Sequence, residues 1–576
     1  MTADLNLPAD LNLPADLNLP ADVSPAAALE PTLDHEVVVI GAGFGGLYAL
    51  HELREAGFSA HAFESGGGVG GTWYWNRYPG ARCDVESVDY CYSFSRELNA
   101  EWAWSERFAG QPEILRYAEH VAERFDLLPM ITFDTRITSA RYDDGDHTWT
   151  VETDQGRRLR CRFLVAAVGA LSATQVPEIP GHDRFTGPTH HTGRWPHEGV
   201  NLAGKRVGVI GTGSSGIQAI PEIAAEAAHL TVFQRTPNYS LPARNRPMSS
   251  REIWVAQRDY EGLLASGNAT NAGVYNVGTG RPALADPPER RAEEYEHRWA
   301  VGGTDLMRTY GDTGRDVEAN ETLAEFVRGK IREIVADPAT AASLVPTDHP
   351  IGSKRICLDS GYFATYNRDN VTLVDLRREP IVTITETGID TDAASYDLDV
   401  LVFATGYDAM TGPLTRIDLR GADGDSLAQR WSGGPRSLLG IAVAGFPNLF
   451  TLTGPGSPSV LANVIRANEQ HVDWVVACLT YLRERGLTRI EADAQAQDAW
   501  AAHVHEVATY TLYLHAKSWY LGANIDGKPR QFMPYIGGMV AYRKACDDCA
   551  AAGYPGFALA GAPRGSAAAT PVTKPA

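Results

Sequence analysis

The chain has 576 residues, which is more than one hydrophobic core normally serves, so two or three domains are expected. Its share of hydrophobic residues, 44%, is that of a folded globular protein. The formal net charge of −20 repels nucleic acid phosphates and anionic lipid surfaces, so neither a nucleic acid nor a membrane partner is expected.

The N-terminal segment contains the hexapeptide Ala-Asp-Leu-Asn-Leu-Pro three times between Ala3 and Pro20. A proline closes each copy and breaks any helix or strand. We therefore predict a disordered tail over residues 1–34, with a partner-binding motif as the alternative, and a second disordered tail over residues 559–576. The N-terminus lacks the regions of a signal peptide and no apolar run is long enough to span a bilayer, so a cytoplasmic location is expected.

The first strand-like segment, Glu36–Ile40, runs directly into a glycine-rich turn and then into an amphipathic helix. This context is typical of a dinucleotide-binding unit, in which the helix N-terminus faces the pyrophosphate. The next strand, Ser59–Phe63, ends at Glu64, and a carboxylate there can accept hydrogen bonds from both hydroxyls of an unphosphorylated ribose. The unit is therefore predicted to bind FAD. Its glycines for the turn, the close approach and the helix packing are Gly41, Gly43 and Gly46.

An aromatic, glycine-rich segment follows from Gly70 to Asp84, without helical or strand periodicity. The same glycine letters occur at Gly66–Gly71, but an aromatic loop follows them, so they are not predicted to bind phosphate. The segment comes directly after the ribose acid and is placed to run under a flavin ring, with an ordinary packed loop as the alternative. The residues expected to contact the cofactor there are Thr72, Trp73, Trp75 and Asp84.

A second unit of the same kind begins with the strand Arg206–Ile210, followed by a glycine loop and a helix. Gln234 holds the position relative to this loop that Glu64 holds in the first unit, and Arg235 and Thr236 follow it. A cation and a hydroxyl suit the 2′-phosphate of NADPH, which a carboxylate would repel; a surface arginine at a strand end is the alternative. The predicted phosphate-binding residues of the loop are Thr212, Gly213, Ser214, Ser215 and Gly216.

Strand-like segments alternate with helices between the tails, which predicts an α/β fold with two Rossmann-like dinucleotide-binding domains. Residues from about 245 to 345 carry charged segments of helical period and are predicted to be a helical insertion. An apolar strand at Asp399–Tyr407 is expected to return the chain between domains. On this reading residues 35–180 and 396–558 form a discontinuous FAD-binding domain, and residues 181–395 form the NADPH-binding domain.

The seven cysteines do not form a disulfide framework. Cys546 and Cys549 make a C-x-x-C pair, but they lie in a segment that reads as a C-terminal helix, without a second pair to complete a zinc site. We interpret them as incidental, with a redox or metal role as the alternative, and predict no metal site.

Two segments together resemble the FAD-containing, NADPH-dependent Baeyer-Villiger monooxygenases. The family fingerprint F-x-G-x-x-x-H-x-x-x-W-P is matched from Phe185 through His191 to Pro196, and the motif G-G-x-W-x-x-x-x-Y-P-G-x-x-x-D is matched from Gly70 to Asp84. The likeness extends from about residue 36 to 558 and looks closest to the phenylacetone and steroid monooxygenases. It implies an enzyme that inserts one oxygen atom of O₂ next to a ketone carbonyl, giving an ester or lactone, with NADPH and a C4a-peroxyflavin.

The resemblance also implies roles for single residues. Arg355 would be the catalytic arginine, whose permanent charge stabilises the anionic peroxide and the adduct with the ketone, and Asp84 would orient it. Lys354 would be a second contact to the 2′-phosphate and Gln218 a contact on the nicotinamide side. The further residues implied around the cofactors are Tyr90, Val464 and Trp519, with Trp519 on a mobile loop.

Two assignments of the resemblance leave alternatives. His191 would act in a hinge between the domains, or it is an ordinary core histidine. The segment Ser457–Asn463 would line the ketone pocket, or it is ordinary packing. A flavin-containing N- or S-oxygenase and a noncatalytic FAD/NADPH redox-binding protein are the rival functions, and Trp195-Pro196 with the Asp84/Arg355 pair argue against the first.

Overall fold

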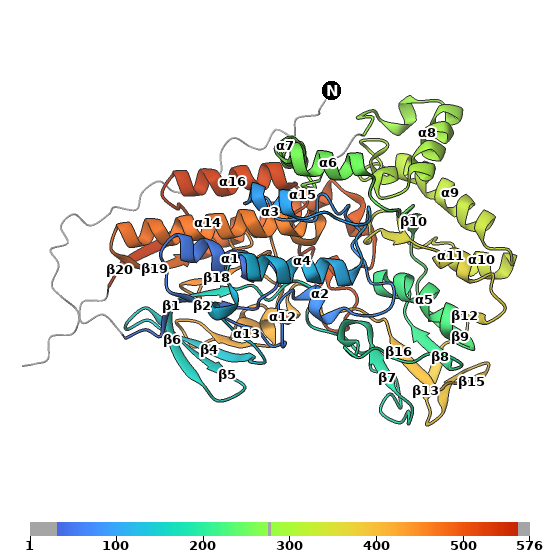
Figure 1. Cartoon of the computed structure of the whole chain (residues 1–576), viewed down its shortest axis with the longest axis horizontal. Helices are drawn as coiled ribbons and strands as arrows, with labels where there is room; N and C mark the ends of the chain where they lie inside the picture. The colour runs from blue at the N-terminus through green and yellow to red at the C-terminus, as the bar shows by residue number, and fades with distance from the viewer. Residues whose placement is uncertain (1–31, 275–277, 563–576) are drawn as a thin grey trace, which may run out of the picture.

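Two sheets organise the computed structural model, which describes residues 32–274 and 278–562. Figure 1 shows the two sheets at opposite ends of the molecule, with most helices on one side of them. The order of strands in each sheet decides which loops meet between the two ends.

The first sheet has eight strands within the described residues, and β1 (His35–Ile40) is one of its interior strands. β1 pairs in parallel with β2 (Ala60–Phe63) on one side and with β6 (Arg158–Ala166) on the other. The carboxyl ends of these three strands therefore meet at one edge of the sheet. The remaining strands are β3 (Ile131–Thr132), β4 (Ile137–Asp143), β5 (Thr148–Thr153), β17 (Asp418–Arg420) and β18 (Leu449–Thr451).

The second sheet is parallel throughout, in the order β12-β9-β8-β16-β7 within the described part of the chain. Its central strand, β8 (Arg206–Ile210), has the bounds predicted from the sequence. The other strands are β7 (Thr189–His191), β9 (His229–Gln234), β12 (Val371–Asp375) and β16 (Val400–Phe403).

The position of β16 corrects the predicted domain boundary. Residues from 396 onward were expected in the first domain, but β16 pairs with β8 and β7 in the second sheet. The chain re-enters the first sheet only at β17. A short strand that is buried on both faces fits the interior of either parallel sheet, so its own residues do not reveal its partners.

Helices cover the sheets and form the insertion. α1 (Phe44–Glu55) packs against the long helix α14 (Val464–Glu484) above the first sheet (Figure 1). The predicted helical insertion holds α6 (Ser250–Arg258), α7 (Tyr260–Asn268), α8 (Pro288–Val301), α9 (Val317–Ile334) and α10 (Pro338–Leu344).

The chain ends differ in part from the predicted tails. The tail predicted over 559–576 begins too early, because β20 (Phe557–Gly561) pairs with β19 (Leu487–Ala492). Residues 563–576 and residues 1–31 of the N-terminal tail lie outside the described residues. Among the described helices none has the length and apolar character needed to cross a membrane.

Candidate active site

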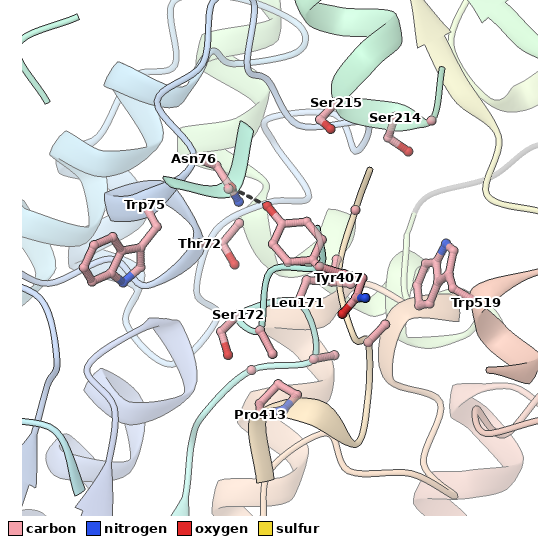
Figure 2. Close-up of a pocket in the computed structure, with 18 of the residues that line it drawn as sticks. Thr72, Trp75, Asn76, Leu171, Ser172, Ser214, Ser215, Tyr407, Pro413 and Trp519 are labelled. Atoms are coloured by element: carbon pink, nitrogen blue, oxygen red, sulfur yellow. Dashed lines mark hydrogen bonds between the residues drawn. The ribbon is translucent and has the colours of Figure 1, made fainter. Parts of the chain in front are cut away.

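A cavity of about 1330 Å³ lies between the two sheets and is lined by both glycine loops. Figure 2 shows Thr72 and Trp75 of the short helix α2 (Thr72–Trp75), Ser214 and Ser215 at the start of α5 (Ser214–Glu226), and Trp519 around this cavity. All predicted cofactor-binding residues line it except Gly46 and Gly216. Residues distant in the sequence are therefore brought to one place.

The first glycine loop follows β1, and its three glycines serve different needs. Gly41 has φ +101°, which favours glycine, and its amide donates to the carbonyl of Phe63 at 2.9 Å. A Cβ on Gly46 would lie 2.0 Å from the carbonyl oxygen of Gly41, so this glycine permits the tight packing of α1 on the loop. Gly43 abuts Gly71, where a Cβ would meet the Gly71 Cα at 3.4 Å.

Glu64 follows β2 and lines the cavity as predicted, but it also braces the loop. It is 5% exposed, and its two carboxylate oxygens accept from the amides of Ala42 at 2.9 Å and Gly66 at 2.7 Å. A carboxylate has about four acceptor sites, so these bonds leave capacity for ribose hydroxyls.

The aromatic segment forms a wall of the cavity rather than a separate packed loop. The indole nitrogen of Trp73 donates to the hydroxyl of Tyr90 at 3.0 Å. The guanidinium of Arg194 stacks 4.0 Å from the ring of Trp75. Arg194 was not predicted, although it lies within the matched fingerprint, directly before Trp195.

The second glycine loop repeats the geometry of the first. Gly211 has φ +110° and donates to the carbonyl of Phe233 at 3.0 Å. A Cβ on Gly216 would lie 2.4 Å from the carbonyl oxygen of Gly211, whereas a Cβ on Gly213 would meet no atom within 4 Å. The hydroxyl of Ser214 lies 3.2 Å from the Cys357 sulfur, and that of Ser215 lies 3.0 Å from the Thr192 hydroxyl.

Two basic side chains, Arg235 and Lys354, lie near the end of β9, where the contact to the 2′-phosphate was predicted. Gln234 is fully buried and donates to the carbonyl of Ser343 at 2.8 Å, so it faces the insertion and not the cavity. Arg235 and Thr236 line the cavity with Lys354. Burial and the charge of Arg235 lower the pKa of Lys354, while Asp348 raises it. A phosphate dianion between the two cations would relieve their repulsion, so these residues fit NADPH.

Asp84 and Arg355 form an ion pair at the cavity wall, with 3.6 Å between the carboxylate and the guanidinium Nε. Asp84 is 11% exposed, and Arg355 is 36% exposed. Burial raises the pKa of Asp84, and the charge of Arg355 opposes that rise. Arg355 Nη1 also donates to the carbonyl of Val460 at 2.9 Å, which fixes the guanidinium in a second direction.

Gln218 lines the cavity, but its amide group is engaged by the protein. Its oxygen accepts from the Tyr78 hydroxyl at 2.7 Å, and its nitrogen donates to the Arg82 carbonyl at 3.0 Å. The side chain thus connects α5 of the second unit to the segment that ends at Asp84.

A second cavity of about 660 Å³ lies behind the ion pair. It shares Asp84 and Arg355 with the first cavity, and apolar side chains form much of its remaining wall. The predicted pocket loop Ser457–Asn463 contributes Val460, Leu461, Ala462 and Asn463. Wall residues that the sequence did not identify include Met248, Leu263, Val274, Met307, Arg308, Leu512, Tyr513 and Tyr520, together with the charged residues Glu86, Asp89, Arg107, Arg251, Glu252 and Asp305.

His191 of the matched fingerprint lies at the end of β7, opposite Phe403 of β16, and its Nδ1 accepts from the Gly193 amide at 2.9 Å.

All seven cysteines, which lie in the described part of the chain, are free, and Cys546 and Cys549 lie in the helix α16 (Met539–Ala551). Among the described residues no group of His, Cys, Asp and Glu could hold a metal ion.

The chain is similar to known proteins along most of its length. The sequence profile of a family described as pyridine nucleotide-disulphide oxidoreductase matches residues 38–270. The acetone monooxygenase (methyl acetate-forming) of Gordonia sp. (strain TY-5) is 43% identical and covers 92% of this chain and 99% of its own. A phenazine N-monooxygenase of Lysobacter antibioticus is 40% identical, over 91% of this chain and 97% of its own.

A solved structure gives the same result for the fold. An oxidised steroid monooxygenase bound to NADP is 51% identical, covers 91% of this chain and 99% of its own, and has a TM-score of 0.87. Solved relatives hold FAD and NADP together, and these are the two cofactors that the two glycine loops fit. The chain therefore belongs to the Baeyer-Villiger monooxygenases, FAD- and NADPH-dependent enzymes that convert ketones to esters or lactones.

Proposed function

We propose that this chain oxygenates a bulky ketone at the boundary of its two cavities, with Arg355 as the catalytic cation and Asp84 as its partner. One observation carries the proposal. Arg355 lines both the cavity between the glycine loops and the largely apolar cavity behind the ion pair. A ketone in the second cavity would therefore face the same guanidinium as the cofactors in the first.

The roles of the two residues follow from their charges. The redox chemistry that activates dioxygen comes from the bound FAD and NADPH. When an oxygen nucleophile adds to a ketone carbonyl, negative charge develops on the carbonyl oxygen, and the permanently charged guanidinium of Arg355 stabilises it. Asp84 compensates the guanidinium charge and limits its movement, because a carboxylate 3.6 Å away favours one orientation.

We assign FAD to the loop after β1 and NADPH to the loop after β8. Glu64 at the first loop suits a free ribose hydroxyl pair, and Arg235 with Lys354 at the second suits a 2′-phosphate. The binding residues assigned are the predicted cofactor-binding residues that line the first cavity, together with Gly46 and Gly216 as packing positions.

The size of the second cavity favours a large ketone. The names of similar proteins range from an acetone monooxygenase to a steroid monooxygenase, so similarity alone does not select a substrate. A volume of about 660 Å³ is far larger than acetone needs and falls within the range of about 300 to 1,000 Å³ that is typical of drug-sized ligands.

The test is a panel of acetone, cyclohexanone, 2-phenylcyclohexanone and a steroid ketone, offered with NADPH and ¹⁸O₂. We expect esters or lactones that carry one ¹⁸O atom, with higher kcat/KM for the two larger ketones. A heteroaromatic amine is included, because one relative is named as an N-monooxygenase.

Arg355→Ala is the decisive variant. It should reduce FAD with NADPH at close to the normal rate, while ester formation falls by about a hundredfold or more, because a positioned charge at the reacting oxygen is lost. Arg206→Ala, at the exposed start of β8, is the control. Normal ester formation by Arg355→Ala, or oxygenation of the amine alone by the unaltered enzyme, would overturn the proposal.

A further inference from the structure

A buried ion pair lies at the start of α14, outside both cavities. Arg466 and Glu469 are 6% and 7% exposed, and their side chains approach to 3.3 Å. Burying two charges costs more free energy than their attraction returns unless further hydrogen bonds hold them. A pair in such a place is therefore a poor source of stability, and its further bonds indicate what it does.

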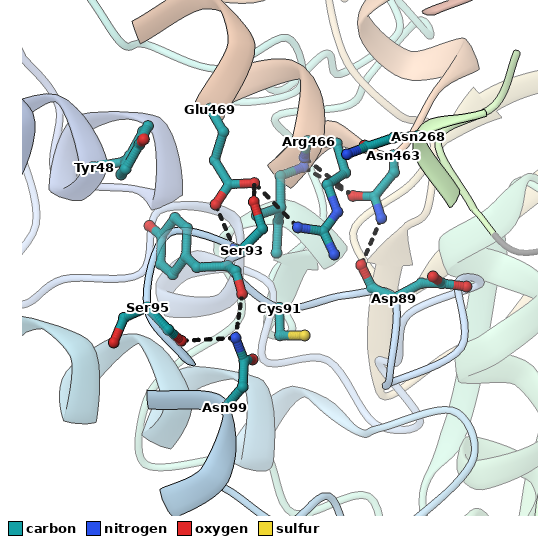
Figure 3. A network of polar contacts seen from close by, with 12 residues as sticks. Tyr48, Asp89, Cys91, Ser93, Ser95, Asn99, Asn268, Asn463, Arg466 and Glu469 are labelled. Carbon is teal, nitrogen blue, oxygen red and sulfur yellow. Dashed lines mark hydrogen bonds and ion pairs between the residues drawn. The ribbon is translucent and has the colours of Figure 1, made fainter. Parts of the chain in front are cut away.

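Those further bonds reach two other parts of the chain. Glu469 accepts from the amide of Ser93 at 2.5 Å and from its hydroxyl at 2.7 Å, as Figure 3 shows. Arg466 Nη2 donates to the hydroxyl of Tyr260 at 2.6 Å, and this hydroxyl donates to the carbonyl of Tyr92 at 2.9 Å. We call Arg466, Glu469, Ser93 and Tyr260 the Arg466 network.

The residue that begins α14 extends the same connections. Asn463 caps the helix by accepting from the amides of Ile465 and Arg466. Its side chain donates to the carbonyl of Asp89 at 2.5 Å (Figure 3). Its backbone amide donates to the carbonyl of Ala272 at 2.8 Å. The N-terminal turn of α14 thus holds the segment 89–93 and the insertion at one point.

The three segments joined here are walls of the second cavity. The first contributes Val85, Val88 and Asp89; the second, from the insertion, contributes Leu263, Ala272 and Val274; the third contributes Val460, Leu461, Ala462 and Asn463. The third also carries the carbonyl of Val460 that accepts from Arg355. No member of the Arg466 network lines either cavity, so it acts through these walls.

We infer that the Arg466 network positions the ketone relative to Arg355 by fixing the three walls of the second cavity. Arg466 and Glu469 are then positioning residues, which affect which lactone is formed and how much of the consumed NADPH leads to ester. The inference rests on the proposed function in one respect, that the second cavity holds the ketone. NADPH oxidation without oxygen transfer releases hydrogen peroxide. If the walls of the second cavity move more freely, the amount of hydrogen peroxide formed per NADPH should therefore increase.

The experiment uses the flavin-loaded full chain with 2-phenylcyclohexanone, in which either carbon next to the carbonyl can migrate, so that two regioisomeric lactones are possible products. Arg466→Met should reduce FAD with NADPH at the normal rate, but KM for the ketone should rise by about tenfold or more. The lactone ratio should change and the share of NADPH lost as peroxide should increase. Tyr260→Phe, which removes the two hydrogen bonds of this hydroxyl but leaves the Arg466–Glu469 ion pair, should shift the same quantities less. Hydrogen exchange at residues 457–463 should be faster in Arg466→Met.

A double variant separates positioning from stability. Arg466→Met combined with Glu469→Met removes both buried charges, so its melting temperature should recover relative to Arg466→Met. The lactone ratio and peroxide release should stay abnormal. Arg489→Met is the control, since Arg489 pairs with Glu491 on β19 at 2.6 Å and lines neither cavity.

Two outcomes would overturn the inference. One is a normal lactone ratio and normal coupling in Arg466→Met; the other is their full recovery in the double variant, which would assign the network to stability. A failure of the proposed function would be distinguished from a failure of this inference, because the unaltered enzyme would then form no lactone.

Discussion

Glycines of the second dinucleotide loop serve two purposes, although one motif contains both. Gly216 is required by the protein itself, because a Cβ there would lie 2.4 Å from the carbonyl oxygen of Gly211. Gly213 has φ −83°, which any residue adopts, and a Cβ there would meet nothing within 4 Å. Folding therefore does not require glycine at 213, and we infer that a ligand that approaches the backbone does.

Substitution by alanine should separate these purposes. Gly216→Ala should lower the melting temperature of the coenzyme-free protein by several degrees, because overpacking costs about 1–3 kcal/mol. Gly213→Ala should leave that temperature unchanged but weaken NADP⁺ binding by about tenfold or more. Differential scanning fluorimetry with and without NADP⁺ measures both. Equal destabilisation by the two variants in the absence of NADP⁺ would contradict this reading.

At the scale of the elements, α14 also stabilises the backbone at the first cavity through His471. This side chain is fully buried, its Nδ1 accepts from the Thr453 amide at 3.0 Å, and its Nε2 lies 2.7 Å from the Tyr542 hydroxyl. Thr453 lines the first cavity and has φ +50°, so the histidine holds a strained backbone at the wall of that cavity. This role of His471 could not be predicted from the sequence, because a single histidine within a helix does not form a recognisable motif.

His471 should make stability depend on pH in a defined range. Burial lowers its pKa to about 3 from the ordinary value of 6.5. The unfolded chain thus gains a proton when pH falls below about 6.5 and the folded chain does not, so stability is full above that pH and falls by about 1.4 kcal/mol per unit toward pH 3. His471→Gln should reduce the loss of melting temperature between pH 7 and pH 5. The exposed His297→Gln is the control, and an unchanged acid slope in His471→Gln would count against the assignment.

Helices and strands that adjoin a recognisable motif were predicted correctly from the sequence. The sheet to which a strand belongs, which depends on tertiary contacts, was not. β8 was predicted to the residue, because its buried run ends at a glycine turn. β16 was assigned to the wrong sheet, since nothing in its four residues selects β7 and β8 as partners. In the predicted helical insertion, α6 and α7 are separate helices that meet at Asp259. A polar residue at a helix junction resembles one on an exposed helix face.

At the scale of the whole molecule, the first cavity lies where two separately predicted units meet. Each unit has its own glycine loop, so the two loops that line the first cavity were predicted from the sequence, whereas Arg194 and much of the remaining wall were not. Most of the second cavity was not predicted either, because the insertion supplies apolar wall residues such as Leu263 and Met307 that are indistinguishable from core residues. Gln218 has a contact that the resemblance did not indicate, because its amide also binds Tyr78 and Arg82 across the junction.

Gln218→Leu should therefore weaken the connection between the units. It removes the bonds to the Tyr78 hydroxyl and the Arg82 carbonyl, and leaving buried polar groups unpaired costs about 1–3 kcal/mol each. We expect a lower apparent melting temperature and more peroxide per NADPH consumed. Gln155→Leu, whose bonds reach Asp134 and Thr135 within the first unit, is the control. An unaltered melting temperature in Gln218→Leu would show that the units hold together without it.

The narrow partition between the two cavities has a consequence for changing this enzyme. Only Asp84, Val85, Lys354, Arg355, Val460 and Ala462 belong to both walls among the described residues. Outer-wall residues such as Val255 on α6 and Leu263 on α7 touch only the second. Grafting these two helices from a relative would thus transfer substrate range while the choice of coenzyme stayed as it is, so the two specificities can be engineered independently.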